Sequence, residues 1–132
     1  MNNKLKCILL IDDDDDDNFF HEREIRKINK TSLVISKDTG KKALEYLQSK
    51  QDTHPNLIFL DINMPGMNGW DFLNEYSKLD KSLQSKVVII MLTTSGDPED
   101  RARARSWSFV SGYITKPLTK EIMVEIIHKF FE

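Results

Sequence analysis

Apolar residues gather in short runs along the chain, and longer, mainly polar stretches separate one run from the next. The runs are Cys7–Ile11, Leu33–Ile35, Leu57–Leu60 and Val87–Leu92, with a weaker fifth at Gly112–Thr115. Continuous apolar runs of this length are typical of strands buried on both faces, as the strands of parallel sheets are. The pattern therefore predicts five strands of a parallel sheet.

The stretches between the runs carry the signals of helices. The first two have apolar residues at helical spacing, namely Phe19, Ile25 and Ile28, and then Ala43, Leu44 and Leu47. The later three have capping residues at their expected starts, namely Asn68 with Asp71, Asp97 before Pro98, and Thr119. Strand and helix thus alternate five times, which predicts an α/β fold, a doubly wound five-stranded parallel sheet with five helices.

Polar residues suited to chemistry follow four of the predicted strands. Asp12 and Asp13 follow the first strand, Asp61 the third, Thr93 the fourth and Lys116 the fifth. Doubly wound sheets bind their ligands beyond the carboxyl ends of the strands. We therefore expect these side chains to form one site.

The residue types at these strand ends indicate phosphoryl transfer. Three neighbouring carboxylates repel one another and need a cation, and hard oxygen ligands favour Mg²⁺. A carboxylate can act as the nucleophile and form an acyl phosphate. The Lys116 ammonium and the Thr93 hydroxyl would then hold the remaining phosphoryl oxygens.

Composition narrows the class of protein. A chain of 132 residues with 39% apolar and 30% charged residues suits a single domain, residues 1–132. Its net charge of −2 gives no overall field that points to nucleic acid or a membrane. The lone Cys7 indicates a buried thiol in a reducing compartment, and Val87–Leu92 is too short to span a bilayer. We expect a cytoplasmic protein.

Four motifs occur in a fixed order: DD at 12–13, D-x-N-M-P-G-x-x-G from Asp61, TT at 93–94 and KP at 116–117. This ordered set resembles the receiver domain of bacterial two-component response regulators, and the likeness covers nearly the whole chain. The resemblance implies a flavodoxin-like fold with strand order 2-1-3-4-5. It also implies a signalling switch rather than an enzyme, with only intrinsic Mg²⁺-dependent self-phosphorylation and dephosphorylation.

By this resemblance, Asp61 is the phosphoacceptor. Asp13 matches the carboxylate that ligates Mg²⁺ directly, Asp12 matches its partner, often acting through water, and Asn63 would lend its backbone carbonyl to the metal. The rest of the acidic run, Asp14–Asp17, is assigned to the loop and first turn of the first helix. There, acidic side chains cap free N–H groups and suit the helix dipole.

Three further positions match the switch of the same family. Thr93 matches the hydroxyl that moves toward the phosphoryl group, and Lys116 matches the lysine that pairs with that group. The Lys116–Pro117 peptide bond is expected to be cis. Tyr113 matches the aromatic residue whose rotamer follows Thr93.

We therefore expect a stand-alone receiver, without an output domain, that takes a phosphoryl group from a histidine kinase or a histidine phosphotransfer protein. An unknown output protein would bind the face formed by the fourth helix, fifth strand and fifth helix. A role as a phosphorelay intermediate that passes the group to a phosphotransfer protein stays open.

A phosphatase of the haloacid dehalogenase type also phosphorylates an Asp at a strand end, but it fits this sequence less well. It needs a second Asp two residues later, as general acid–base, and a Thr or Val two residues after that. Those positions are Asn63 and Pro65 here.

Overall fold

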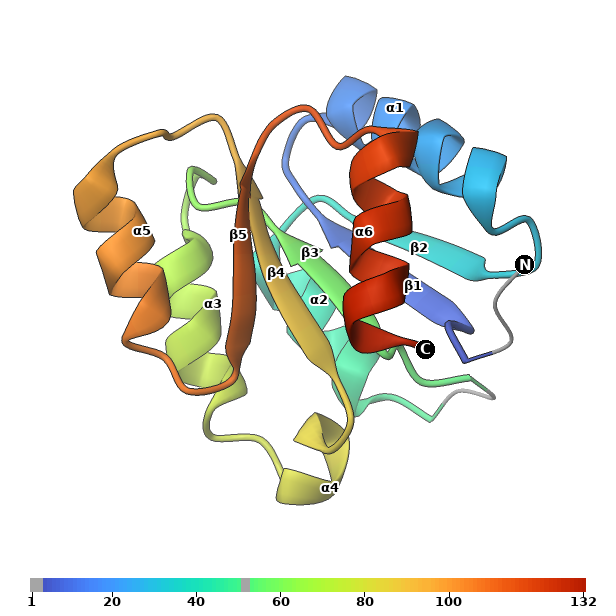
Figure 1. Cartoon of the computed structure of the whole chain (residues 1–132). Helices are drawn as coiled ribbons and strands as arrows, with labels where there is room; N and C mark the ends of the chain where they lie inside the picture. The colour runs from blue at the N-terminus through green and yellow to red at the C-terminus, as the bar shows by residue number, and fades with distance from the viewer. Residues whose placement is uncertain (1–3, 51–52) are drawn as a thin grey trace.

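The computed structural model describes residues 4–50 and 53–132. Within these residues, five strands and six helices follow one another along the chain (Figure 1). The strands are β1 (Cys7–Ile11), β2 (Leu33–Lys37), β3 (Leu57–Leu60), β4 (Val88–Thr93) and β5 (Val110–Thr115). The helices are α1 (Asp15–Ile28), α2 (Gly40–Gln48), α3 (Gly69–Tyr76), α4 (Lys81–Gln84), α5 (Pro98–Arg105) and α6 (Lys120–Phe130).

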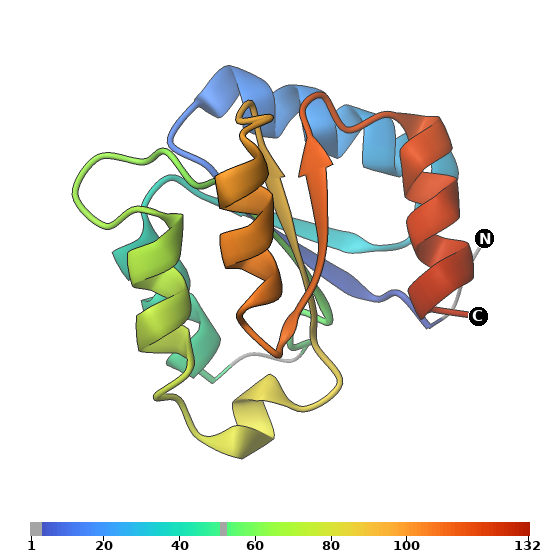
Figure 2. The ribbon, with the colours of Figure 1, turned by 60° about the vertical axis from the view of Figure 1, so that its left-hand side comes forward.

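The strands form one parallel sheet in the order β2-β1-β3-β4-β5, as predicted. Helices α2, α3 and α5 cover one face of the sheet, and α1 and α6 cover the other (Figures 1 and 2). The fold is thus the doubly wound α/β fold that the alternation of strands and helices indicated. In the described part of the chain, no helix combines the length and the apolar character needed to cross a membrane.

The central strands divide their side chains between two apolar cores. In β1, Leu9 and Ile11 face the core under α2, α3 and α5, whereas Ile8 and Leu10 face the core under α1 and α6. All four side chains are buried, and burial of each contributes about 1.5–3 kcal/mol to folding. Two buried faces explain why these strands read as continuous apolar runs instead of alternating ones.

Three helix starts agree with the capping residues read from the sequence, including that of α6, where the Thr119 side chain accepts a hydrogen bond from the Ile122 N–H. Asn68 and Asp71 form a reciprocal capping box at the start of α3. Asp97 accepts a hydrogen bond from the Glu99 N–H, and Pro98 is the first residue of α5. These caps fix where α3 and α5 begin relative to the strand ends that precede them.

The prediction of five helices was wrong by one, because the described residues include the short α4. This single turn, capped by Asp80, buries no side chain, so it has no apolar pattern for sequence analysis to detect. Strand bounds also moved: β2 continues to Lys37, β4 is shifted by one residue, and β5 begins at Val110. The partly exposed positions of the edge strands β2 and β5 break the apolar runs that mark the buried strands.

Candidate functional site

The carboxyl ends of four neighbouring strands bring the candidate residues together at one edge of the sheet. Asp12 follows β1, Asp61 follows β3, Thr93 is the last residue of β4, and Lys116 follows β5. Because β1, β3, β4 and β5 are adjacent in that order, residues far apart in the chain converge here. The Asp61 N–H donates to the Ile11 carbonyl at 3.0 Å, which ties Asp61 directly to the end of β1.

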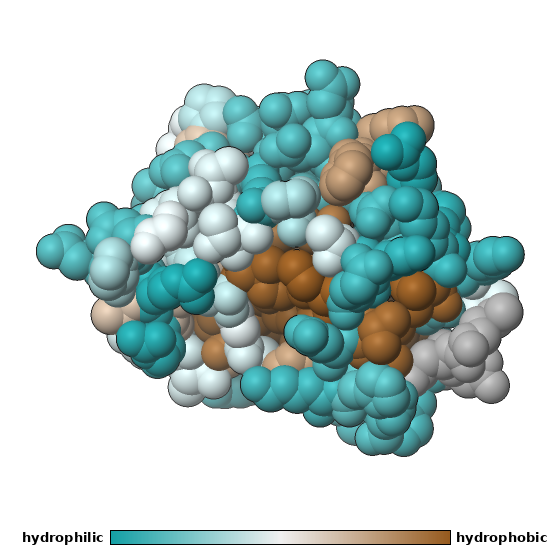
Figure 3. Space-filling model, turned by 45° about the horizontal axis from the view of Figure 1, so that its top comes forward, coloured by the Kyte–Doolittle hydropathy of each residue, from teal (hydrophilic) through white to brown (hydrophobic). Residues whose placement is uncertain are grey.

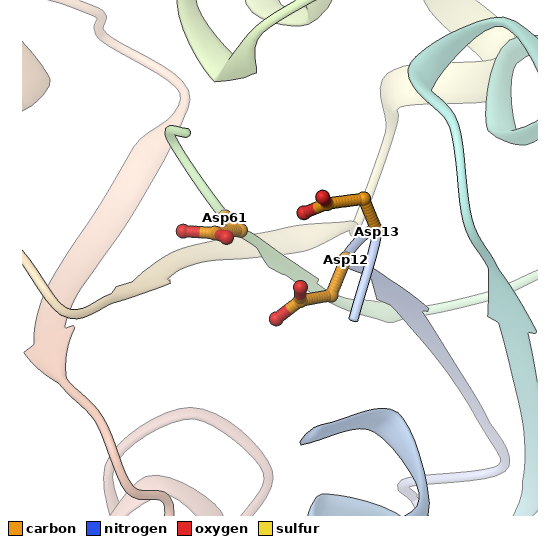
Figure 4. Close-up of side chains that lie close together, drawn as sticks. All are labelled: Asp12, Asp13 and Asp61. Carbon is orange, nitrogen blue, oxygen red and sulfur yellow. The ribbon is translucent and has the colours of Figure 1, made fainter. Parts of the chain in front are cut away.

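Three carboxylates gather at this edge (Figure 4). Each of Asp12, Asp13 and Asp61 offers an oxygen atom, and these oxygens lie within 4.8 Å of one another. Asp12 and Asp61 are buried, with 4% and 6% of their surface exposed, while Asp13 is exposed to solvent. Gathering three negative charges at this distance is unfavourable unless a cation balances them.

Lys116 supplies one positive charge to the cluster. Its Nζ lies 2.6 Å from Asp12 Oδ2 and 2.7 Å from Asp17 Oδ2, but 3.5 Å from Asp61 Oδ2. Burial alone would lower the pKa of Lys116, but its hydrogen bonds to Asp12 and Asp17 outweigh that effect and raise the pKa. Lys116 is therefore a firmly charged ammonium ion, shared among carboxylates.

Asp12 and Asp13 differ in how their oxygens are engaged. Asp12 Oδ1 accepts a hydrogen bond from the Asp14 N–H at 3.0 Å, and Oδ2 is paired with Lys116. Burial raises the pKa of Asp12 above its usual range, and the bond to Lys116 opposes that rise. The Asp13 carboxylate, within the described part of the chain, has neither a hydrogen bond nor an ion pair. Asp13 thus has its oxygens available for a cation.

The donor set fits Mg²⁺. The carboxylates of Asp12, Asp13 and Asp61 cluster together, and the Lys116 ammonium is shared with a fourth carboxylate, from Asp17, so the site keeps an excess of negative charge. Mg²⁺ binds through one or two carboxylates and retains several waters, and exposed Asp13 beside buried Asp61 meets that need. Asn63, which is itself exposed, lies two residues after Asp61 in the loop that leads to α3.

Helix α1 contributes Asn18 and His21 to the lining of the site. A small space of about 10 Å³ is lined in part by Asn18, His21, Asp12 and Asp61. Asn18 Nδ2 donates to the Asp12 carbonyl at 2.9 Å, while its buried Oδ1 has no hydrogen-bond partner among the described residues. Burial lowers the pKa of His21, and the nearby Lys116 charge lowers it further. A neutral His21 adds no positive charge beneath the carboxylates.

Gly69 allows the loop after Asp61 to fold back onto the strand end. A Cβ atom at Gly69 would lie 2.6 Å from the Asp61 carbonyl oxygen and 2.8 Å from the Ile62 Cα. The Gly69 N–H also donates to the Ile62 carbonyl at 2.8 Å. Any side chain here would push on the backbone of Asp61, so the glycine fixes the position of this carboxylate.

Thr93 and Tyr113 are joined through Ser95. Thr93 is fully buried, and its Oγ1 accepts a hydrogen bond from the Ser95 N–H at 3.3 Å. The Tyr113 hydroxyl donates to the Ser95 carbonyl at 2.8 Å, and Ser95 Oγ donates to Asp100 Oδ2 at 2.6 Å. One loop residue thus contacts both expected switch residues and the first turn of α5.

Tyr113 is also covered by a side chain from α5. The Arg101 guanidinium lies 4.6 Å from the centre of the Tyr113 ring and donates to Thr115 Oγ1 at 3.1 Å. The neighbouring Lys116 N–H donates to the Thr93 carbonyl at 2.7 Å, and the Lys116–Pro117 peptide bond is cis. The end of β5 is therefore held against both α5 and β4.

Two site residues, Asp17 and Ser95, were not identified as such from the sequence. Asp17 was assigned to helix capping with the rest of the acidic run, yet Asp14 alone accepts the capping bonds, from the Asp16 and Asp17 N–H groups. Helical spacing is the one feature of the sequence that could have identified Asp17 as a site residue. Asp17 lies one turn before the buried His21 and so shares its side of α1. Ser95 has no sequence signal beyond its place two residues after Thr93.

Known proteins similar to this chain include response regulators, transcriptional regulators and a chemotaxis protein. The sequence profile of the response regulator receiver domain matches residues 8–128. The chain is 35% identical over 97 residues to the chemotaxis protein CheY of Pseudomonas aeruginosa, with 72% of each chain covered. It is also 34% identical over 112 residues to the probable transcriptional regulator ycf27 of Cyanophora paradoxa, covering 80% of this chain. The chain spans only 40% to 43% of the length of three such ycf27 regulators.

Solved structures show the same likeness in three dimensions. A two-component response regulator from Cytophaga hutchinsonii superimposes with a TM-score of 0.88 at 32% identity, covering 97% of this chain and 98% of that chain. The chemotaxis protein CheY4 of Vibrio cholerae superimposes with a TM-score of 0.78 at 22% identity, covering 96% and 98%. At that lower identity the second comparison supports the fold alone.

Proposed function

This chain belongs to the response regulator receiver domain family, and from that premise we propose that it accepts a phosphoryl group on Asp61. The donor is a phosphohistidine of a histidine kinase or a histidine phosphotransfer protein, and the reaction takes place in the cytoplasm. One observation carries the proposal: the buried Asp61 carboxylate lies within 4.8 Å of two further carboxylates and 3.5 Å from the Lys116 ammonium. This is the environment that an acyl phosphate and its metal ion require.

In the proposed transfer, an Asp61 oxygen attacks the phosphorus atom and forms a new oxygen–phosphorus bond. The phosphorus–nitrogen bond of the donor breaks, and its electron pair stays on the imidazole. The Lys116 ammonium offers a charged hydrogen bond to a phosphoryl oxygen. The Thr93 hydroxyl, at the end of the adjacent strand, offers a second one once it leaves the Ser95 N–H.

Asp13, Asp61 and the Asn63 carbonyl would hold Mg²⁺, with Asp12 acting through water. When bound, this ion neutralises charge on the phosphoryl oxygens as they pass from donor to acceptor. Asp12 contributes by anchoring Lys116 at 2.6 Å, which keeps the ammonium beside Asp61.

The output would pass from Thr93 to the surface over β5 and α6. Tyr113 reaches Ser95 on one side and lines a groove of about 470 Å³ on the other. Its apolar lining includes Ile90, Ile114 and Ile126, and Figure 3 shows apolar atoms gathered in the middle of this face within a polar rim. A protein partner that binds this groove would sense a change at Tyr113.

Intact-mass spectrometry after incubation with acetyl phosphate tests the acceptor, with and without Mg²⁺, on the wild type and Asp61→Asn. We expect one phosphoryl increment that requires Mg²⁺ and is absent from the variant. Urea unfolding of both proteins controls for folding, since Asn is nearly the same shape as Asp. A fully labelled Asp61→Asn variant would contradict the acceptor assignment.

A further inference from the structure

Asp17 holds Lys116 from the side of α1. It is the third residue of that helix, its side chain is 37% exposed, and its Oδ2 lies 2.7 Å from Lys116 Nζ. Among the described residues, the Asp17 carboxylate has Lys116 as its one partner. Asp14 already caps the helix, so Asp17 is not needed for that task. The contact with Lys116 is the distinguishing feature of Asp17 within the acidic run.

The ammonium group has three N–H donors to distribute. Two of them point to close acceptors, Asp12 at 2.6 Å and Asp17 at 2.7 Å, while Asp61 lies further away at 3.5 Å. A phosphoryl group on Asp61 needs one short bond from this same ammonium. A short bond from the third N–H requires Nζ to move toward Asp61, and the short bond to Asp17 opposes this movement.

The charge of Asp17, like its position, disfavours phosphorylation of Asp61. The incoming phosphoryl donor is an anion, and Asp17 cancels part of the positive charge that Lys116 would present to it. Because the Lys116 side chain is only 9% exposed, solvent screens this effect less than it would at the surface.

Resting on the proposed phosphorylation of Asp61, we propose that Asp17 is a positioning residue that draws Lys116 away from Asp61 and slows phosphorylation. Asp17 lies outside the group of three carboxylates suited to hold the metal, and it acts through Lys116. A residue in the first turn of α1 thus limits the rate at which Asp61 is phosphorylated.

The test compares the initial rates at which acetyl phosphate phosphorylates Asp61, at saturating Mg²⁺, in Asp17→Asn and Asp16→Asn. Both variants remove one negative charge from the first turn of α1, but Asp16 is exposed and does not contact Lys116. We expect Asp17→Asn to be labelled about three- to tenfold faster than wild type. Asp16→Asn should stay within about twofold, since its charge is screened. Equal rates in the two variants, or slower labelling of Asp17→Asn, would overturn the proposal.

Two further variants separate a role through Lys116 from a structural role. Asp17→Glu restores the charge and should return the rate toward wild type. In a Lys116→Gln background, Asp17→Asn should give no additional acceleration, because the residue through which it acts is gone. Acceleration that persists without Lys116 would refute the mechanism.

The outcomes distinguish this inference from the proposed function. A wild type that is never labelled overturns the proposed function and this inference together. A wild type that is labelled at Asp61, with Asp17→Asn behaving like Asp16→Asn, overturns this inference alone.

Discussion

Two groups of residues flank Asp61, and they are held together by different interactions. On the side of α1, the charged group consists of Asp12, Asp17 and Lys116, joined by ion pairs as short as 2.6 Å, together with the Asp13 carboxylate, which clusters with Asp12 but forms no ion pair among the described residues. On the side of α5, the uncharged group consists of Thr93, Ser95 and Tyr113, joined by hydrogen bonds.

Under the proposed function, this difference lets one site serve two purposes. Electrostatic interactions act over several ångströms and tolerate small displacements, so the charged group suits the attraction of a metal ion and an anionic donor. Neutral hydrogen bonds are short and directional, so a shift of Thr93 breaks its bond to the Ser95 N–H. Because the Tyr113 hydroxyl is bonded to the Ser95 carbonyl, the shift also changes the surroundings of Tyr113. We infer that the charged group governs the chemistry and the uncharged group transmits its result.

The largest expected effect is on metal binding by the charged group. Asp13→Asn should weaken Mg²⁺ affinity about tenfold or more, because it removes the carboxylate whose oxygens are available for a cation. Asp16→Asn is the matched control, since it removes the same charge from an exposed position nearby. Isothermal titration calorimetry with Mg²⁺ measures both affinities. Equal losses would mean that the acidic run attracts the ion only by its overall charge.

A smaller effect is expected when the two groups are uncoupled. Lys116→Gln removes the ammonium but keeps a hydrogen-bond donor, so Asp61 should still be phosphorylated slowly while the response at α5 is weakened. Tryptophan fluorescence reports on that region, because Trp70 lies 4.6 Å beneath the Arg103 guanidinium of α5. Trp107 follows the same helix.

The fluorescence change on phosphorylation should fall by more than half in Lys116→Gln, when the signal is corrected for the fraction labelled. Unfolding by urea at saturating Mg²⁺ must first show that the variant is folded, since Asp12 loses its buried partner. A fluorescence response equal to that of the wild type would show that the uncharged group does not depend on Lys116.

The smallest effect is expected from Arg101, whose guanidinium covers the Tyr113 ring of the uncharged group. Arg101→Ala removes the guanidinium that covers Tyr113 and should lower the free energy of unfolding by about 0.5–1 kcal/mol. Labelling of Asp61 should be unchanged within about twofold, because Arg101 contacts no charged site residue. Arg105→Ala, on the same helix, serves as the control. A large loss of labelling would show that the two groups are not separable.

The sequence was sufficient to predict the fold and to predict which residues meet at the strand ends. Buried strands leave continuous apolar runs, and parallel strands bring their carboxyl ends to one edge, so Asp12, Asp61 and Lys116 were expected to meet. Their convergence follows from topology alone and needs no knowledge of side-chain contacts.

The remaining features depend on contacts that no local pattern records. Asp17 looks like any acidic residue in the first turn of a helix until β5 places Lys116 beside it. Ser95 contacts Thr93 and Tyr113 through its backbone, so its residue type carries little information about these two contacts. The short α4 depends on one polar cap, Asp80, and buries no side chain.

The ion pair between Asp17 and Lys116 also has a consequence for biosynthesis. It joins residues that are 99 positions apart, and Lys116 follows the last strand of the sheet. A growing chain on the ribosome therefore exposes its acidic residues well before the balancing lysine emerges. Only a chain that has been translated through β5, and has docked that strand beside β4, possesses a complete acceptor site. Under the proposed function, a chain truncated before β5 lacks the Lys116 ammonium beside Asp61 and is not switched by phosphorylation.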